Sequence, residues 1–357
     1  MNLAWNLLQF VLIMMGLVLV HEAGHMVVAK WCGMRVEKFS IFFGRPLASF
    51  QRGETQYAIG WLPLGGYVKI TGMTREEDVP ADVSHRAYFA APVWRRIATI
   101  AAGPGVNVVL AVLAFAIMFW IGVPRTVEST PTVAQVTAES PAATIGLQQG
   151  DQIVAVDGVR GELETLRERL SARPGEVVEV TYRRGEQEFT RSVRLRTEFV
   201  DGEAVGRLGL AFGFREGPPE SSGLVGGVVD ALDFSWFVTE TTGRVIARQF
   251  TDPNLDEASS VVGAGAVYNE VADDGLTTVL RFIGLISLAL ALFNLLPLPP
   301  LDGGHILFAL VEKVRGSPVP RRVYESVSIA GFVVILFVGL LLIQNDIFRI
   351  SNGTLLP

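Results

Sequence analysis

The sequence predicts a polytopic α-helical membrane protein with four transmembrane helices, a membrane-associated β-loop and an inserted α/β domain. Half of the 357 residues are hydrophobic and only 18% are charged, a composition too apolar for a wholly soluble chain. Four apolar runs long enough to cross a bilayer alternate with polar stretches. The longest polar stretch lies between the second and third runs, and it predicts the inserted domain.

Charge and cysteine content exclude several classes of function. The formal net charge is −6 and the pI is near 5.4, so the chain offers no basic face for nucleic acid. Cys32 is the only cysteine in the sequence, which excludes an intrachain disulfide and a thiolate-rich zinc site. A metal ion would therefore be held by nitrogen and oxygen atoms.

The first predicted span, residues 1–35, carries a metal-binding pattern inside an apolar run. About twenty uncharged residues lead into the sequence His-Glu-Ala-Gly-His at positions 21–25. Helix residues four apart share one face, so His21 and His25 can both face one zinc ion, with Glu22 beside it as the catalytic base. A chance match in an ordinary helix is the alternative. An ionised carboxylate at membrane depth costs at least ~2.5 kcal/mol, which favours the functional interpretation.

Residues 36–96 are expected to form a cytoplasmic, membrane-reentrant β region. Between Lys30 and Arg96 the chain has ten basic and six acidic residues, so the positive-inside rule places this segment in the cytoplasm and the N-terminus outside. Three β-prone runs, 36–43, 55–61 and 65–70, are unusually apolar. We expect them to dip toward the membrane, where a free strand edge can hold an extended peptide. A solvent-facing hairpin is the alternative.

The second predicted span, residues 97–124, runs outward. Near its start stands the sequence Gly-Pro-Gly-Val-Asn at positions 103–107. Its small residues allow close helix contact, and Asn107 can hydrogen-bond a neighbouring helix. We therefore expect Asn107 to pack or to position a neighbour, and not to catalyse.

The inserted domain is predicted at residues 130–216. Its run 140–158 resembles a PDZ domain of the bacterial protease type. Such domains bind an extended chain or its C-terminus along an edge groove. A structural cap without a ligand is the alternative.

Residues 217–275 are expected to be a linker with an amphipathic interfacial helix, because 228–250 mixes apolar side chains with five charged ones. The third span and the motif that follows it occupy 276–312. A cytoplasmic loop at 313–326, a fourth span at 327–345 and an external tail at 346–357 complete the chain.

The third span ends in a proline-rich stretch that carries a candidate third zinc ligand. Three prolines fall within residues 297–300 and cannot continue a regular helix, so the backbone must unwind where it faces protein, water or substrate. Asp302 follows at the end of this span and needs a nearby cation. It lies on the same cytoplasmic side as the histidine pair, so we expect it to complete the zinc site. His305 is a rival that we expect to support or pack against the site.

Together, these motifs resemble the site-two protease family of intramembrane zinc metalloproteases, in its bacterial RseP-like group with a single PDZ domain. The resemblance rests on His21-Glu22-x-x-His25, the Gly-Pro-x-x-Asn element, the PDZ-like insert and Asn294-x-x-Pro297-x-Pro299-x-x-Asp302-Gly303, and it covers nearly the whole chain. Two features depart from the family pattern. Some relatives have two PDZ domains, and the usual Ser-Gly-Pro-x-Gly stretch here reads Ser-Val-Val-Gly at 260–263.

The resemblance implies a role for each matching residue. His21, His25 and Asp302 match the Zn²⁺ ligands, and Glu22 matches the general base. Asn294 and Pro297 match residues that hold substrate. Gly65, Gly66 and Tyr67 fall in the segment that resembles the family's membrane-reentrant β-loop, which contacts substrate.

The expected function is hydrolysis of peptide bonds in or near the transmembrane segment of single-span membrane proteins. The substrates would be pre-cleaved by another protease, as in anti-sigma factors or signal-peptide remnants. The expected location is the lipid bilayer of the bacterial cytoplasmic (inner) membrane. Both termini and the PDZ-like domain would lie outside, and the active site would lie toward the cytoplasm.

Two other functions fit the same motifs less well. A zinc transporter would need more intramembrane ligands than the four histidines of this chain allow, and it gives no reason for the inserted domain. A membrane scaffold with a vestigial site would have no need of Glu22, because only the reaction requires a base.

Overall fold

The computed structural model describes residues 3–73, 77–138, 140–200, 203–249, 251, 259–272 and 274–352. The chain forms two compact units. One comprises Met1–Gly122 and Ser221–Pro357, and the other comprises Val123–Glu220.

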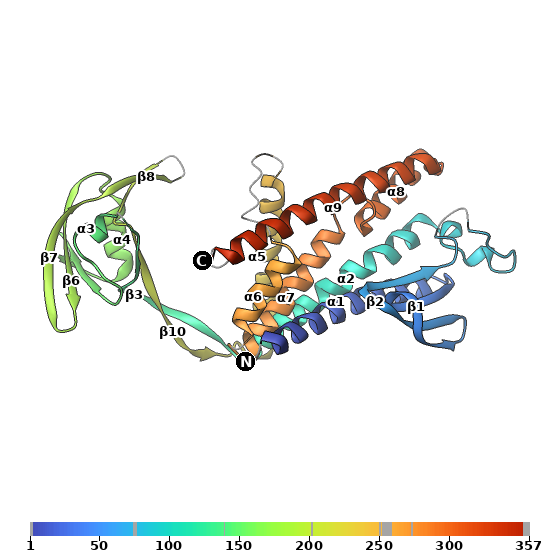
Figure 1. The fold of residues 1–357 in the computed structure, drawn as a ribbon, viewed down its shortest axis with the longest axis horizontal. Coiled ribbons are helices and arrows are strands. Elements are labelled where there is room, and N and C mark those ends of the chain that lie inside the picture. The colour runs from blue at the N-terminus through green and yellow to red at the C-terminus, as the bar shows by residue number, and fades with distance from the viewer. Residues whose placement is uncertain are drawn as a thin grey trace. The chain divides into compact units, whose positions relative to one another are not determined.

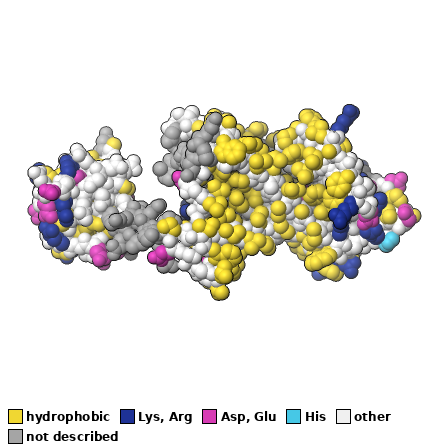
Figure 2. All heavy atoms as spheres, turned by 90° about the horizontal axis from the view of Figure 1, so that it is seen from below, with side chains coloured by type: hydrophobic (Ala, Val, Ile, Leu, Met, Phe, Trp, Pro, Cys, Tyr) yellow, Lys and Arg dark blue, Asp and Glu magenta, His cyan; other side chains and the backbone are white. Residues whose placement is uncertain are grey.

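The first unit is mainly helical (Figure 1). Its helices are α1 (Leu3–Trp31), α2 (Val93–Ile121), α5 (Gly223–Gln249), α6 (Val261–Val271), α7 (Leu276–Asn294), α8 (Asp302–Arg315) and α9 (Arg321–Ser351), with short 3-10 turns η1 (Ser84–Arg86) and η2 (Tyr88–Ala90). Among the described residues, α1, α2, α7 and α9 are long and apolar enough to cross a membrane, which confirms the predicted fold class. Figure 2 shows hydrophobic side chains over much of the face of the helical unit that is in view.

Helix α2 lies between α1 and α7 and contacts both of them (Figure 1). Small residues make these contacts close. A Cβ atom at Gly24 of α1 would stand 2.6 Å from the carbonyl oxygen of Ala102 in α2, and a Cβ at Gly284 of α7 would meet the ring of Phe115. Membrane helices without a water-driven hydrophobic effect associate through such close packing.

The β region consists of β1 (Val36–Arg52) and β2 (Thr55–Ile70), which are longer than the three short runs that the sequence predicted. The first part of β1 pairs on one side with residues 56–59 and on the other with residues 66–70. Residues 48–52 pair with 55–59. Residues 66–70 therefore form an edge of this sheet as far as the described pairings extend.

In the helical unit, helices α6 and α8 were not predicted from the sequence. The expected linker at 217–275 is largely helical and contains both α5 and α6, and α8 begins at Asp302 immediately after the proline-rich stretch. Helix α9 continues to Ser351, so the expected tail from residue 346 is helical over its first half. Whether α5 lies in the membrane interface stays a prediction.

Helix α6 is joined to α9 by a buried carboxylate. Asp346 of α9 is 0% exposed and accepts hydrogen bonds from the backbone N–H of Ser260 (2.6 Å) and Gly263 (3.2 Å). These N–H groups begin α6 and have no partner within the helix. A Cβ at Gly263 would collide with the Asp346 carboxylate, so the Ser-x-x-Gly stretch fits a cap from another helix.

The second unit contains a sheet in the order β10-β3-β4-β6-β7, with β5 beside β4, and a separate hairpin. Its elements are β3 (Val123–Val136), α3 (Pro141–Thr144), β4 (Gln152–Val156), β5 (Val159–Arg160), α4 (Leu163–Ser171), β6 (Val177–Arg184), β7 (Gln187–Arg194), the hairpin β8 (Arg196–Val200) and β9 (Glu203–Arg207), and β10 (Leu210–Glu220). Val133, Ile153, Leu166 and Val178 belong to its buried core. This small α/β domain matches the PDZ-like insert that the sequence predicted.

Two aspartates explain why the run 140–158 folds as it does. Asp151 is 2% exposed, accepts a hydrogen bond from the backbone of Gln148 (2.8 Å) and pairs with Arg184 (2.7 Å). Asp157 (φ +50°) and Gly158 (φ +73°) both adopt the left-handed conformation, as the tight Asp-Gly turn between β4 and β5 requires.

Candidate metal centre

Three side chains that are far apart in sequence meet inside the helical unit. The Nε2 atoms of His21 and His25 lie 3.2 Å apart, and Oδ2 of Asp302 lies 3.1 Å and 3.4 Å from them. Both histidines are buried, at 7% and 8% exposure. Among the described residues, they and Asp302 form the cluster that could hold a metal ion.

The donor set and its spacing fit zinc. Imidazole nitrogen and carboxylate oxygen are ordinary zinc donors, with bonds of about 2.0–2.2 Å in a tetrahedral arrangement. Donor atoms around such an ion are therefore roughly 3.3 Å apart, close to the three observed distances of 3.1, 3.2 and 3.4 Å. Oδ2 of Asp302 is buried and has no hydrogen-bond donor among the described residues, as expected for an oxygen atom that binds a cation.

Each helix contributes for a local reason. His21 and His25 are one helical turn apart on α1, so their rings stand on the same face. Asp302 is the first residue of α8. The glycines that follow Asp302 let α8 fold back on the unwound chain, since a Cβ at Gly303 would collide with the carbonyls of Leu295 and Leu296.

Helix α2 leaves room for the two imidazoles. A Cβ at Gly103 would stand 2.9 Å from Cε1 of His21 and would collide with the ring of His25. The backbone carbonyl of Thr99, one turn before Gly103, accepts a hydrogen bond from Nδ1 of His25 (2.9 Å). Asn107, one turn after Gly103, places its amide 3.3 Å from Nδ1 of His21. The Gly-Pro-x-x-Asn element thus forms the floor of the centre.

Glu22 lies beside the histidines and faces a cavity. The cavity measures about 370 Å³ and is lined by α1, by β1 and β2, and by Val261 of α6. Gly65 and Gly66 lie in its wall, and a Cβ at Gly66 would come within 3.3 Å of Cγ of Glu22. The sheet edge at residues 66–70 therefore passes directly along the Glu22 side chain.

The other predicted site residues have different surroundings. The Asn294 amide donates to the carbonyl of Leu290 in its own helix (2.9 Å), and Pro297 is exposed. The Tyr67 ring stacks on Phe43 with centroids 5.6 Å apart. The structure thus brings together the histidines, Asp302, Glu22 and the two glycines, while Asn294, Pro297 and Tyr67 lie outside this group.

His305 is not part of the cluster of possible metal donors. Its Nδ1 atom lies 2.8 Å from the hydroxyl of Tyr324 in α9. This contact fits the supporting or packing role expected for His305.

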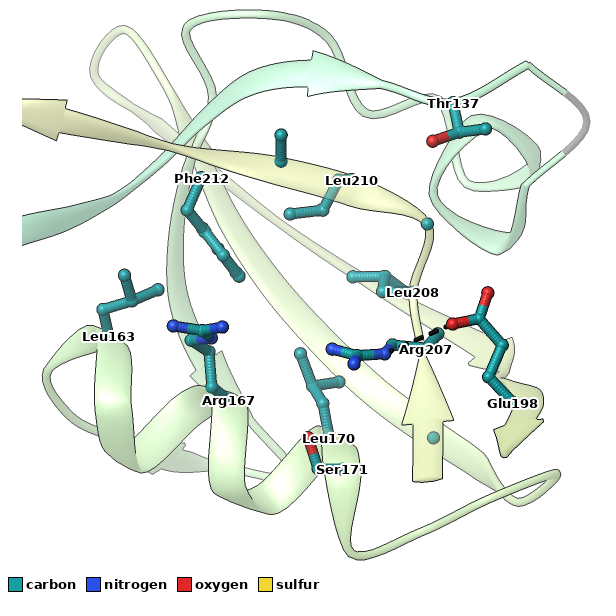
Figure 3. A pocket seen from close by; sticks show the side chains of 13 residues that line it. Thr137, Leu163, Arg167, Leu170, Ser171, Glu198, Arg207, Leu208, Leu210 and Phe212 are labelled. Carbon is teal, nitrogen blue, oxygen red and sulfur yellow. Dashed lines mark ion pairs between the residues drawn. The ribbon is translucent and has the colours of Figure 1, made fainter. Parts of the chain in front are cut away.

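The PDZ-like unit has a groove of its own (Figure 3). It measures about 420 Å³ and lies between α4 and the start of β10. Leu163 and Leu170 of α4 face Leu210 and Phe212 of β10 across it (Figure 3), and a Glu198–Arg207 ion pair (3.5 Å) stands at one side.

Comparisons with known proteins agree with this arrangement. The model of peptidase family M50 matches residues 9–338. A putative zinc metalloprotease of Agrobacterium fabrum is 33% identical, with 96% of this chain and 95% of the relative covered. Zinc metalloprotease RasP of Geobacillus kaustophilus is 28% identical, with 96% and 97% covered.

Two further similarities concern the whole chain and the inserted domain. The regulator of sigma-E protease RseP of Salmonella typhimurium is 28% identical over 98% of this chain and 100% of its own length. A PDZ domain of an SdrC-like protein from Listeria monocytogenes is 20% identical, with 25% of this chain and 92% of that domain covered at a TM-score of 0.21. The chain therefore belongs to peptidase family M50, the site-two protease family, and is a membrane-embedded zinc metalloprotease.

Proposed function

We propose that this protease hydrolyses peptide bonds in or next to the transmembrane segment of single-span membrane proteins. In this proposal His21, His25 and Asp302 hold the zinc ion and Glu22 is the general base. The observation that supports it most directly is the meeting of His21, His25 and Glu22, which belong to the membrane-length helix α1, with Asp302 at the start of α8. An ionisable cluster at that depth is costly, which makes a functional role the default explanation.

The residues around the centre provide the rest of the chemistry. Zinc, when bound, supplies a Lewis acid beside the scissile carbonyl and makes water acidic enough to lose a proton near neutral pH. Glu22 takes that proton on its carboxylate and later returns it to the leaving amine. The apolar walls of the cavity at Glu22 keep bulk water away from the reacting atoms.

The sheet edge gives the substrate its conformation. A helical peptide bond is shielded, so a membrane segment must unwind before it is cut. Residues 66–70 offer a strand edge beside Glu22, and an extended peptide can pair with such an edge through backbone hydrogen bonds. Asn294, Pro297 and Tyr67 are proposed to hold other parts of the unwound segment.

The biological setting is also part of the proposal. The name of the Salmonella relative, regulator of sigma-E protease, favours substrates that control a sigma factor, such as a pre-cleaved anti-sigma factor. We place the enzyme in the inner membrane with both termini outside and the metal centre toward the cytoplasm. The groove of the PDZ-like unit, with its apolar walls, is proposed to bind an extended peptide or a C-terminus.

The test uses the full chain reconstituted in proteoliposomes with a labelled single-span substrate. Glu22→Gln should keep stoichiometric zinc and lose cleavage, whereas Glu240→Gln, a change on the exposed face of α5, should behave as wild type. Asp302→Ala should lower the zinc content. Unchanged cleavage by Glu22→Gln would refute the proposed base, and full zinc in Asp302→Ala would refute the proposed ligand set.

A further inference from the structure

Asn107 is a polar residue in the apolar helix α2, and one hydrogen-bonding atom of its side chain has no partner. It is 0% exposed, and its Oδ1 atom has no hydrogen-bond partner among the described residues. Its Nδ2 atom lies 3.3 Å from Nδ1 of His21. A buried amide without its full set of hydrogen bonds lowers the stability of the fold by about 1–3 kcal/mol. A functional role would explain why an asparagine is nevertheless found at this position.

To bind one metal ion, each of the two histidines must direct a ring nitrogen with a free lone pair at it. Because the Thr99 carbonyl can only accept, Nδ1 of His25 carries the hydrogen in that 2.9 Å contact and Nε2 keeps its lone pair in the neutral ring. In the neutral ring, Nε2 of His21 offers a lone pair only if Nδ1 of His21 likewise carries the hydrogen. A buried N–H group of this kind needs a hydrogen-bond acceptor. Within the described residues, the group that faces Nδ1 of His21 is the amide of Asn107.

We propose that Asn107 is a positioning residue of the metal centre, whose amide oxygen accepts the Nδ1–H of His21 and so keeps the Nε2 lone pair of His21 directed at zinc. The two orientations of an amide fill the same volume, so turning Oδ1 toward His21 needs no movement of the backbone. This inference rests on the proposed ligand role of His21.

A second contact holds Asn107 in place. The hydroxyl of Ser287, which is 0% exposed, donates to the backbone carbonyl of Asn107 (2.8 Å). Ser287 belongs to α7, the helix that leads into the Asp302 segment. The contacts Ser287–Asn107 and Asn107–His21 thus link α7 and α2 to one proposed zinc-binding atom of α1, Nε2 of His21. Partners of this kind fix the ring orientation of metal-binding histidines, and their loss usually costs 10–100-fold in metal affinity.

The experiment measures zinc release from the detergent-solubilised full chain to an excess of chelator, at one pH and temperature. Asn107→Leu removes the acceptor and should release zinc about 10–100-fold faster than wild type. Asn107→Asp keeps an acceptor oxygen and should release zinc at close to the wild-type rate. Asn6→Leu is the matched control, because it removes another buried amide (2% exposed) from the far end of α1, and it should leave the release rate unchanged.

A second measurement separates positioning from general loosening of the fold. With Co²⁺ in place of zinc, Asn107→Asp should keep the visible absorption pattern of wild type, whereas Asn107→Leu should change it. Ser287→Ala should give an intermediate release rate, and it carries the test if Asn107→Leu does not fold.

The outcomes that overturn the inference are distinct from failure of the proposed function. Release at the wild-type rate by Asn107→Leu, or equally fast release by Asn107→Asp and Asn107→Leu, would overturn the acceptor role. If Asp302→Ala also kept its zinc, the ligand set itself would be wrong. If Asp302→Ala lost zinc while Asn107→Leu did not, the role of Asn107 alone would fail.

Discussion

Replacing Gly103 by alanine should disable the metal centre with a single methyl group. A Cβ at this position would stand 2.9 Å from Cε1 of His21 and would collide with the ring of His25. Ordinary carbon contacts lie at about 3.5–4.0 Å, so the His21 ring must move by at least about 0.5 Å and the His25 ring by more. Functional sites require placement within about 0.5 Å.

The expected loss follows from that displacement. Misplacing a reacting group by about 1 Å costs on the order of 100-fold in rate, so Gly103→Ala should lower kcat/KM by at least that factor and reduce the zinc content below one per chain. Zinc is measured by elemental analysis of the purified full chain, and cleavage is measured with a single-span substrate in proteoliposomes.

Gly105 provides the matched control on the same helix. A Cβ there would meet no atom within 4 Å, and alanine is favoured over glycine in helices by about 1 kcal/mol. Gly105→Ala should therefore keep its zinc and activity and unfold no more readily than wild type. Full zinc and full activity in Gly103→Ala would refute the steric reasoning, and equal losses in both variants would assign the effect to α2 as a whole.

Three further predictions concern other parts of the chain. Asp346→Leu removes the cap of α6 and should lower the free energy of unfolding by about 1–2 kcal/mol, as measured by thermal unfolding, whereas an unchanged melting temperature would refute the capping role. Arg184 holds the pKa of Asp151 below its usual range through their hydrogen bonds, so this pair stabilises the PDZ-like unit at neutral pH, and the stabilisation is lost as the pH falls through that lowered pKa. Arg184→Gln should therefore lower the melting temperature near pH 7 and make progressively less difference below about pH 4, while a pH-independent difference would contradict this. Arg96→Met breaks a largely buried 2.8 Å pair with Glu312 and should cost about 3 kcal/mol, and the double change with Glu312→Leu should recover most of that loss if the pair, and not the Arg96 stem, is responsible.

The sequence predicted the meeting of His21, His25 and Asp302 because this part of the chemistry is tied to residue spacing. The prediction needed only that two histidines four residues apart share a helix face and that the carboxylate after the proline-broken span lies on the same side of the membrane. The structure places Oδ2 of Asp302 within 3.4 Å of Nε2 of both histidines. The family and the zinc ion are also confirmed by the relatives.

The surroundings of the site could not be predicted to the same degree. The partner of His25 is a backbone carbonyl at Thr99, and every residue has one, so the side chain gives no signal. Helix α8 was missed because two glycines follow Asp302 and glycine disfavours a helix interior, although these glycines allow the first turn of α8 to approach the unwound chain. The cap at Asp346 was missed because it joins residues 83 and 86 positions apart.

Helix α9 is attached at a few points along its length. Tyr324 meets His305 near its start, Gly331 lies against the carbonyl of Pro299, and Asp346 caps α6 near its end. Between the last two points Phe332, Phe337 and Leu340 are each at least half exposed. This stretch can accept a spin label or a photo-crosslinking side chain with little disturbance, and a label there would report which lipids and which arriving helices touch the enzyme before any bond is cut.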